Sequence, residues 1–541
     1  MKYKILLLFF LLWFGILTLT GSLYSGFHFT DDYEVVRLDR DLSHTTIGRE
    51  ARTFSKNLFS AKMRFRPLYV LHRRVNAIIF GSNFLALSVY TGLLAVFTSW
   101  FLFLFMRKTG FSLVESVLFG CLTLLGEQAA VWWKLGANET LGMFMLSIAM
   151  LFMAQGVYAE KRKTLYNLLF IFFTILATWS KESFILMIPA LVFWQIWLTY
   201  QKGKIEADKH GPGLPMTFWR VVRGNINTAV VLLLVCAAEL IHIVTKVGTT
   251  DIQYAGYEGF DLAKFIKTFM QLSVTAHGWV IFLQLAIIIF ILLFRLKLRK
   301  IRLKYIFTSY HYWGAILFLL IVGPQIVLYM KSGIMERYLL PGIMGYTFLM
   351  ILLLKSIGIH TVGKYVSLWN RFFPWDSPRS RTGVVVILVL AVITLQNLRV
   401  TRYTAIAFAH EGKHTNAWFQ SIEQNTRESD LILVITEPVK YLEPSVSLKT
   451  YLNIEMKRRN IFFTGAKVKP SKSGFWWDLN KDFSYRFTEV EFAVVLVFPS
   501  LEQEFLNHST HWFKPEGFKR YSNEAGFISY YKKETTKETK G

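Results

Sequence analysis

Long apolar segments separated by short polar stretches make up most of the chain from its start to about residue 400. A run of about 20 mostly apolar residues is long enough to cross a bilayer as a helix. Ile5 to Leu19 follows a short basic start and has no Ala-x-Ala-like cleavage site, so we expect a retained anchor helix. Together with it, the pattern predicts about eleven transmembrane helices, the others near residues 79–106, 111–127, 139–157, 164–180, 183–200, 226–246, 276–294, 312–330, 338–357 and 383–398.

The basic residues predict the orientation of these helices. They gather in alternate loops, for example at residues 161–163 and 295–304, while the short loops between those carry isolated cations; the first outer loop, which is basic, is the exception. Because cytoplasmic loops of membrane proteins are enriched in Lys and Arg, we expect a cytoplasmic N-terminus. An odd number of spans then places residue 401 and everything after it outside the cytoplasm.

Composition agrees with a membrane protein. Hydrophobic residues make up 53% of the chain and aromatic residues 16%, which is too apolar for a soluble chain of 541 residues. The formal net charge of +25 is explained by the inner loops, so nucleic acid is not an expected partner. Cys121 and Cys236, the two cysteines, lie in apolar segments and are expected to pack there.

The C-terminal part has a different pattern. Residues 430–436, 460–464 and 491–498 are short β-branched or aromatic runs typical of strands, and residues 416–423 and 446–456 favour helices. We therefore predict a transmembrane domain over residues 1–400, a small extracytoplasmic α/β domain over residues 401–531 and a disordered tail over residues 532–541.

The first outer loop, residues 21–80, holds the first candidate chemistry. Asp31 and Asp32 are adjacent and Glu34 follows; Arg64 and Arg66 come about thirty residues later. A carboxylate can accept a proton from an acceptor hydroxyl, and an arginine fork can pair two phosphate oxygens. A solvated helix cap and a lipid-headgroup anchor are the plainer interpretations. Between these acids and the two arginines, residues 43–58 have the spacing of a short interfacial helix.

Further charges lie at the predicted outer ends of later helices. A charged group at membrane depth costs free energy, so its presence there needs a structural or functional explanation. The expected supporting residues are Glu127, Glu139, Lys181, Glu182, Glu336, Arg337 and Tyr338. An ion pair at a helix end would explain Lys181 and Glu182 equally well, and an interfacial anchor would explain Arg337 and Tyr338. If they are functional, Asp31, Arg66, Glu182 and Arg337 should lie together.

These residues, taken in order, resemble a known family. Asp31-Asp32 and Arg64-Phe65-Arg66-Pro67-Leu68 after a first helix look like the GT-C superfamily of integral-membrane glycosyltransferases. Ser180-Lys181-Glu182 and Glu336-Arg337-Tyr338-Leu339-Leu340-Pro341 are similar to patterns in its protein mannosyltransferase-like branch. The resemblance implies a GT-C fold and an inverting transferase that uses a polyprenyl-phosphate sugar donor and a cell-envelope glycan, lipid or protein acceptor. It also implies that Asp31 or Asp32 acts on the acceptor and that Arg64, Arg66 and Arg337 bind the donor phosphate.

Other functions stay open at this point. A lipid-linked glycan polymerase or ligase needs similar outer charges. A transporter needs ionisable residues at membrane depth and broken helices, for which Glu239, His242 and Gly323-Pro324 are the candidates. A divalent cation is compatible with the acids, although no ligand spacing requires one. The composition favours a bacterial plasma membrane.

Overall fold

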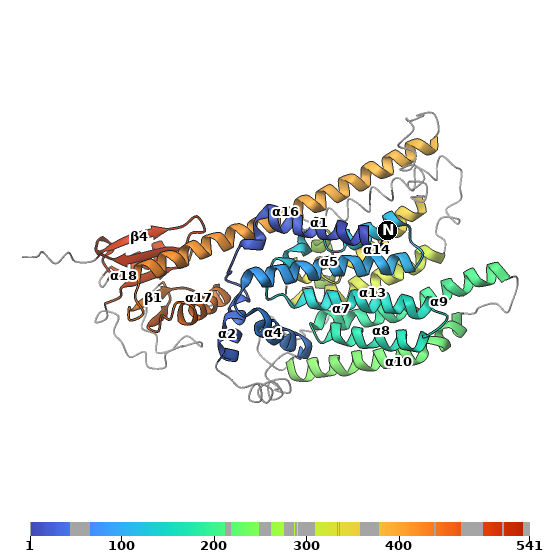
Figure 1. Ribbon diagram of the computed structural model, residues 1–541, viewed down its shortest axis with the longest axis horizontal. Coiled ribbons are helices and arrows are strands. Elements are labelled where there is room, and N and C mark those ends of the chain that lie inside the picture. Colours follow the sequence, from blue (N-terminus) through green and yellow to red (C-terminus); the bar gives the residue numbers. More distant parts are fainter. Residues whose placement is uncertain are drawn as a thin grey trace, which may run out of the picture.

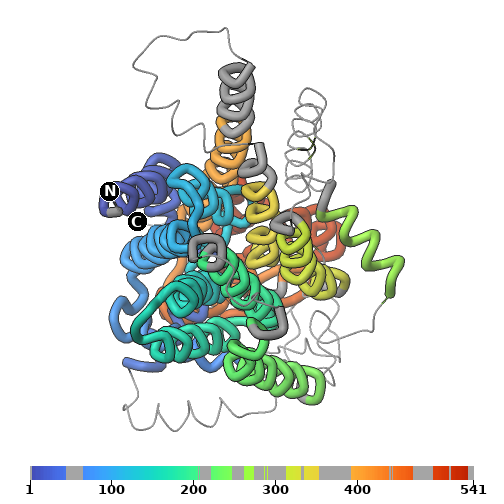
Figure 2. The backbone as a smooth tube through the Cα atoms, turned by 90° about the vertical axis from the view of Figure 1, so that its right-hand side faces the viewer, coloured from blue at the N-terminus to red at the C-terminus, as the bar shows by residue number. Residues whose placement is uncertain are grey.

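The computed structural model describes most of the chain, and Figures 1 and 2 show its backbone. The described residues are 2–43, 65–210, 218–247, 261–274, 286, 289, 309–332, 334, 336–357, 378–437, 440–466, 491–510 and 513–533. Residues 44–58 of the predicted interfacial helix, most of the predicted span at 276–294 and most of the predicted disordered tail lie outside these ranges.

A bundle of helices forms the larger part of the molecule. In Figure 1 these helices run side by side along the long axis, and Figure 2 shows the bundle after a turn of 90°. Its α-helices are α1 (Lys2–Thr20), α4 (Pro67–Phe80), α5 (Phe84–Lys108), α6 (Leu113–Leu122), α7 (Asn138–Tyr158), α8 (Lys163–Thr178), α9 (Ile188–His210), α10 (Phe218–His242), α11 (Leu262–Val274), α13 (Ser309–Ser332) and α14 (Ile343–Ile357).

Six of the described helical segments are long and apolar enough to cross a membrane. They are Tyr3–Thr20, Phe84–Lys108, Asn138–Tyr158, Glu182–Lys204, Val221–Thr245 and Tyr312–Met330. Apolar side chains on these helices stay exposed, such as Leu11 on α1 and Leu234 on α10, as expected where a helix faces lipid. The chain is a multi-pass membrane protein.

Helix boundaries differ from the prediction in several places. The span predicted at residues 79–106 begins later, because α4 ends at Phe80 and Asn83 starts α5 by accepting a hydrogen bond from the Ala86 amide (3.0 Å). Leu113–Leu122, Lys163–Thr178 and Ile343–Leu352 are apolar but shorter than the six spans. Asp261 caps α11, its Oδ1 accepting a hydrogen bond from the Ala263 amide at 2.8 Å.

Helix α16 connects the bundle to the C-terminal domain. It runs without interruption from Pro378 to Asn425, 48 residues, and extends along one side of the bundle into that domain (Figure 1). It contains the predicted last span and the helix predicted at residues 416–423. The predicted domain boundary at residue 400 therefore lies inside a continuous helix.

The C-terminal domain is a small α/β unit built on a five-stranded sheet with strand order β2-β1-β3-β5-β4. Its strands are β1 (Ile432–Ile435), β2 (Ile461–Thr464), β3 (Val494–Val497), β4 (Phe518–Ser522) and β5 (Ile528–Lys532), with helices α17 (Leu442–Ile454) and α18 (Glu502–Ser509). The first three strands are parallel and confirm the predicted ones. The antiparallel β4 and β5 were not predicted; β4 has no fully buried position, so it lacks an apolar signal.

The first loop and the C-terminal domain share one hydrophobic core. Phe27 and Phe29 are buried among aromatic rings of the domain: the Phe27 ring lies 4.7 Å from Tyr451, and the Phe29 ring 5.2 Å from Phe527. Helix α2 (Asp32–Ser43), which follows, packs against α17. This shared core fixes the start of α2 at the end of the bundle next to the domain.

Candidate functional site

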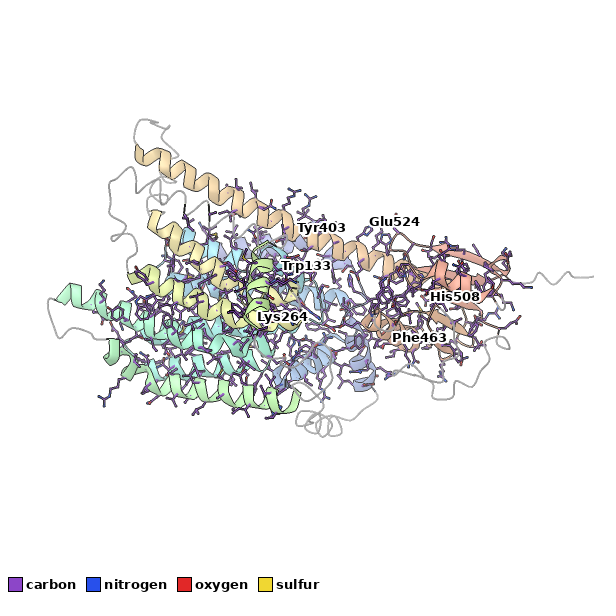
Figure 3. All side chains as sticks on the ribbon, turned by 180° about the vertical axis from the view of Figure 1, so that it is seen from behind. Trp133, Lys264, Tyr403, Phe463, His508 and Glu524 are labelled. Carbon is purple, nitrogen blue, oxygen red and sulfur yellow. The ribbon has the colours of Figure 1, made fainter. Side chains whose placement is uncertain are left out.

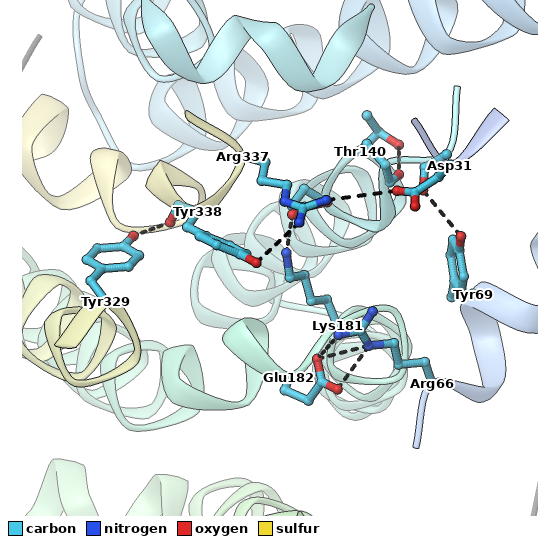
Figure 4. Close-up of polar contacts among 12 residues, drawn as sticks. Asp31, Arg66, Tyr69, Thr140, Lys181, Glu182, Tyr329, Arg337 and Tyr338 are labelled. Carbon is cyan, nitrogen blue, oxygen red and sulfur yellow. Dashed lines mark hydrogen bonds and ion pairs between the residues drawn. The ribbon is translucent and has the colours of Figure 1, made fainter. Parts of the chain in front are cut away.

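The candidate residues lie where short elements join the long helices, at the end of the bundle nearest the C-terminal domain. They come from the start of α2, the start of α4, the start of α7 and two 3-10 helices, η3 (Glu182–Met187) and η6 (Glu336–Leu339). Ser447 of α17 donates to the Thr30 carbonyl oxygen at 2.9 Å, which places the domain beside the same group. Figure 4 shows these side chains facing one another.

Asp31 faces Arg337 across this site. The Asp31 carboxylate lies 3.9 Å from the Arg337 guanidinium, and both side chains are about a third exposed, 32% and 31%. Burial raises the pKa of Asp31 to about 6, helped by the negative charges of Glu34 and Glu443 and opposed by Arg337 and Arg73. A carboxyl with this pKa is charged at neutral pH and basic enough to accept a proton.

Asp32 points away from that site. It is fully buried, accepts a hydrogen bond from the His28 backbone amide (3.0 Å) and lies 3.4 Å from the His28 ring. The His28 ring in turn contacts the Phe408 carbonyl oxygen of α16 (3.0 Å). Adjacent side chains at a helix start point about 100° apart, which is why the two aspartates separate. Asp32 therefore ties the first loop to α16.

Lys181 links η3, η6 and α7. Its ammonium group forms an ion pair with Glu139 at the start of α7 and lies 4.5 Å from the centre of the Tyr338 ring. The Arg337 guanidinium lies 5.2 Å from the same ring. Two cations therefore lie beside the same aromatic ring, and this contact helps to hold Arg337 beside the charged cluster.

Arg66 forms a bidentate ion pair with Glu182. Its Nε lies 2.9 and 3.0 Å from the two carboxylate oxygens, and its Nη2 lies 2.5 Å from Oε2. When the Asn138 amide is oriented so that its nitrogen donates to the Gly136 carbonyl oxygen, its oxygen accepts a hydrogen bond from Arg66. The fork of Arg66 is thus already occupied. Arg64 lies outside the described residues.

One face of α4 supplies two residues that the sequence analysis did not assign. Tyr69 donates to Glu34 (3.0 Å) and to the Gly136 carbonyl oxygen (3.3 Å). Arg73, which is buried, donates to the Leu135 carbonyl oxygen (2.9 Å) and to that of Asp31 (3.1 Å). Arg66 at the N-cap, Tyr69 and Arg73 are spaced three and four residues apart, as on one face of a helix, a signal that was present in the sequence.

Glu443, on the first turn of α17, is the other unpredicted residue. It is exposed, and its charge acts on both Asp31 and Arg337. No local sequence pattern indicates this, because Glu443 is brought to the site by the docking of a separate domain. The structure places the remaining predicted acids, Glu127 and Glu336, at the starts of η2 (Glu127–Trp132) and η6, which pack against each other.

The predicted divalent cation at the acids stays a prediction. Among the residues that the structure describes, the three side chains close enough together to bind one metal ion lie on α16 and in the C-terminal domain. This group does not include Asp31, Asp32 or Glu34.

Neither a protein-family model nor a curated protein matches this chain. Among solved structures, it is similar to ArnT from Cupriavidus metallidurans bound to undecaprenyl phosphate, with 12% identity over 98% of this chain and 97% of that chain and a TM-score of 0.47. The apo form of that ArnT gives 13% identity over 96% and 97%, with a TM-score of 0.46. An oligosaccharyltransferase from Archaeoglobus fulgidus, tethered with an acceptor peptide, gives 11% identity over 98% of this chain and 74% of that chain, with a TM-score of 0.46. These are similarities of overall architecture, and no residue role is transferred from them.

Proposed function

We propose that the protein is a membrane glycosyltransferase that moves a sugar from a polyprenyl-phosphate donor to a cell-envelope acceptor outside the cytoplasm. One observation carries the proposal: a carboxylate with a raised pKa, Asp31, faces an arginine, Arg337, at the end of a membrane bundle. A transfer from a lipid phosphate requires a proton acceptor for the attacking hydroxyl and a cation for the departing phosphate. The two side chains match these requirements.

The reaction proposed is a direct displacement. The acceptor hydroxyl oxygen attacks the anomeric carbon of the sugar while its proton passes to the Asp31 carboxylate. The bond between that carbon and the phosphate oxygen breaks on the opposite side, and its electron pair leaves with the polyprenyl phosphate. One displacement inverts the configuration of the anomeric carbon. Proton transfer by a positioned base contributes about 10²–10⁴-fold to such a step.

Arg337 is assigned to the departing phosphate. At 3.9 Å, its ion pair with Asp31 is longer than three others between described residues of the site, Arg66–Glu182, Arg73–Glu34 and Lys181–Glu139. Of these pairs, the one with Asp31 is therefore the most easily exchanged for a phosphate, while the Tyr338 ring keeps the guanidinium in place. A fixed cation that meets charge as it develops stabilises the transition state more than the ground state.

Arg66 and Lys181 are assigned to positioning. Arg66 holds Glu182 and Asn138 at the edge of the proposed donor site, and Lys181 fixes Tyr338 and with it Arg337. No step in the proposal is routed through a divalent cation.

The proposal is tested by mass spectrometry of cell-envelope glycans. Cells carrying the wild-type gene, no gene, Asp31→Asn or Asp41→Asn are compared. Asp41 lies on α2, the helix that follows Asp31, and its half-exposed side chain is paired with Arg40, so it serves as the matched control. A glycan modification present with the wild type and Asp41→Asn, and absent from the other two, supports the proposal. A glycan profile that is the same in all four strains would contradict it.

A further inference from the structure

Two histidines and a glutamate meet on the surface where α16 passes the sheet. His410 and His414 are one turn apart on α16, and Glu524 lies in the turn between β4 and β5. The Glu524 carboxylate is 3.4 Å from His410 Nε2 and 3.3 Å from His414 Nε2, and the two ring nitrogens are 2.9 Å apart. The three ligand atoms all lie within 4.8 Å of one another. Figure 3 labels Glu524 at this edge of the domain, next to α16.

The chemistry of these three groups suits a transition-metal ion. Imidazole nitrogens together with a carboxylate oxygen form a common ligand set for Zn²⁺, with ligand distances of about 2.0–2.2 Å. Residues 410–414 read His-Glu-Gly-Lys-His, in which two histidines four apart lie on one helix face, as in zinc-binding helices. The third ligand comes from a segment more than a hundred residues later, so local sequence does not explain its position.

The surrounding contacts hold this arrangement in place. Asn523, next to Glu524, donates to the His414 carbonyl oxygen at 3.1 Å and accepts from the Phe527 amide at 3.0 Å. The hairpin turn is thus attached to the same turn of α16 that carries the ligands. On another side of that turn, a Cβ on Gly412 would come within 2.5 Å of the His28 ring, so the helix is pressed against the first loop.

We propose that His410, His414 and Glu524 bind a divalent transition-metal ion of the Zn²⁺ type, with water in the remaining positions. The ion joins α16 to the β4–β5 hairpin and so fixes the C-terminal domain on the bundle. His410 and Glu524 are 59% and 76% exposed, so the site lacks the water-excluding surroundings of a hydrolytic centre, and we assign it a binding role. Glu411 and Lys413, the neighbouring charges on the helix, are not in the ligand group.

The experiment uses the purified full-length protein in nanodiscs after treatment with a chelator. Zn²⁺ affinity and stoichiometry are measured by competition with a chromophoric chelator. The wild type is expected to bind one ion, and His410→Ala, His414→Ala and Glu524→Gln each to weaken binding at least tenfold. His508→Ala and Glu411→Gln are the matched controls: His508 contacts its own helix at the Glu504 carbonyl oxygen (2.8 Å), and both should bind like the wild type.

A second measurement guards against variants that lose their fold. Because an ion that binds only the folded state stabilises it, Zn²⁺ should raise the unfolding temperature of the wild type and both controls by more than that of the three ligand variants. Equal zinc affinity in the wild type and all three ligand variants would overturn the proposal, as would zinc binding without any thermal shift. Asp31→Asn should bind zinc normally, so this result does not depend on the proposed transferase activity.

Discussion

Asp31 is the side chain on which the proposed chemistry depends, because it combines partial exposure, a raised pKa and an arginine opposite. Replacing it by asparagine keeps its shape and most of its hydrogen bonding but removes the proton acceptor. We expect Asp31→Asn to lower turnover by about 10²–10⁴-fold and to leave binding of undecaprenyl phosphate, used as the probe, nearly unchanged. Purified Asp31→Asn and Asp41→Asn are compared in both assays. Full turnover in Asp31→Asn would exclude the base role.

Arg337 should act on phosphate binding. We expect Arg337→Ala to weaken undecaprenyl phosphate binding by about 1.5–3 kcal/mol, the usual value for a hydrogen bond to a charged group. Arg337→Lys keeps the charge but loses the planar fork, so it should recover part of that loss. Arg40→Ala, on the exposed side of α2, is the control. Unchanged affinity of Arg337→Ala for undecaprenyl phosphate would mean that this residue is an interfacial anchor and does not bind the phosphate.

The raised pKa of Asp31 predicts the acid limb of the pH profile. The charged carboxylate is the active form, so kcat/KM should fall about tenfold per pH unit below a pH of about 6. Glu443→Gln removes a negative charge that raises this pKa, so the limb should move to lower pH. The shift should shrink as salt is added, because Glu443 is exposed and its field is screened. Glu516→Gln, an exposed acid on η8 (Pro515–Gly517), should not move the limb.

At the scale of elements, the loop before α7 sets the position of Asp31. A Cβ on Gly136 would lie 2.2 Å from the Asp31 Cβ, while the Leu135 and Gly136 carbonyl oxygens accept from Arg73 and Tyr69. This loop therefore joins α4 to the start of α2 with no room for a side chain. We predict that Gly136→Ala displaces Asp31 and lowers turnover at least tenfold.

The control for that change is Gly224→Ala on α10, where an added Cβ meets nothing within 4 Å. Both variants are measured for turnover and for unfolding temperature. A Gly136→Ala protein with wild-type turnover would show that Asp31 does not need this contact.

At the scale of the whole molecule, the site and the C-terminal domain share one end of the bundle, so they must face the same side of the membrane (Figure 1). The alternation of basic loops predicts that this is the extracytoplasmic side. Reporter fusions after Lys533, following β5, and after His210, at the end of α9, should report opposite sides. The same side for both would mean that the predicted number of spans is wrong.

The sequence by itself determined the class of the molecule and much of its local structure, because these depend on signals within one segment. Apolar runs of membrane length predict helices wherever they occur, and short continuous β-branched or aromatic runs predict β1, β2 and β3. The spacing of charges at helix ends singled out Asp31, Lys181, Glu182 and Arg337, which the structure brings together.

Tertiary structure alone decided which of these residues face one another. The burial of Asp32 beside His28 depends on the packing of His28 against α16, and the pairing of Arg66 with Glu182 joins residues 116 positions apart. Two further positions depend on the docking of the C-terminal domain, whose core includes Phe27 and Phe29. They are the position of Glu443 near Asp31 and that of Glu524 beside His410 and His414. Contacts between distant segments leave no periodic trace in either segment, so only the folded chain reveals them.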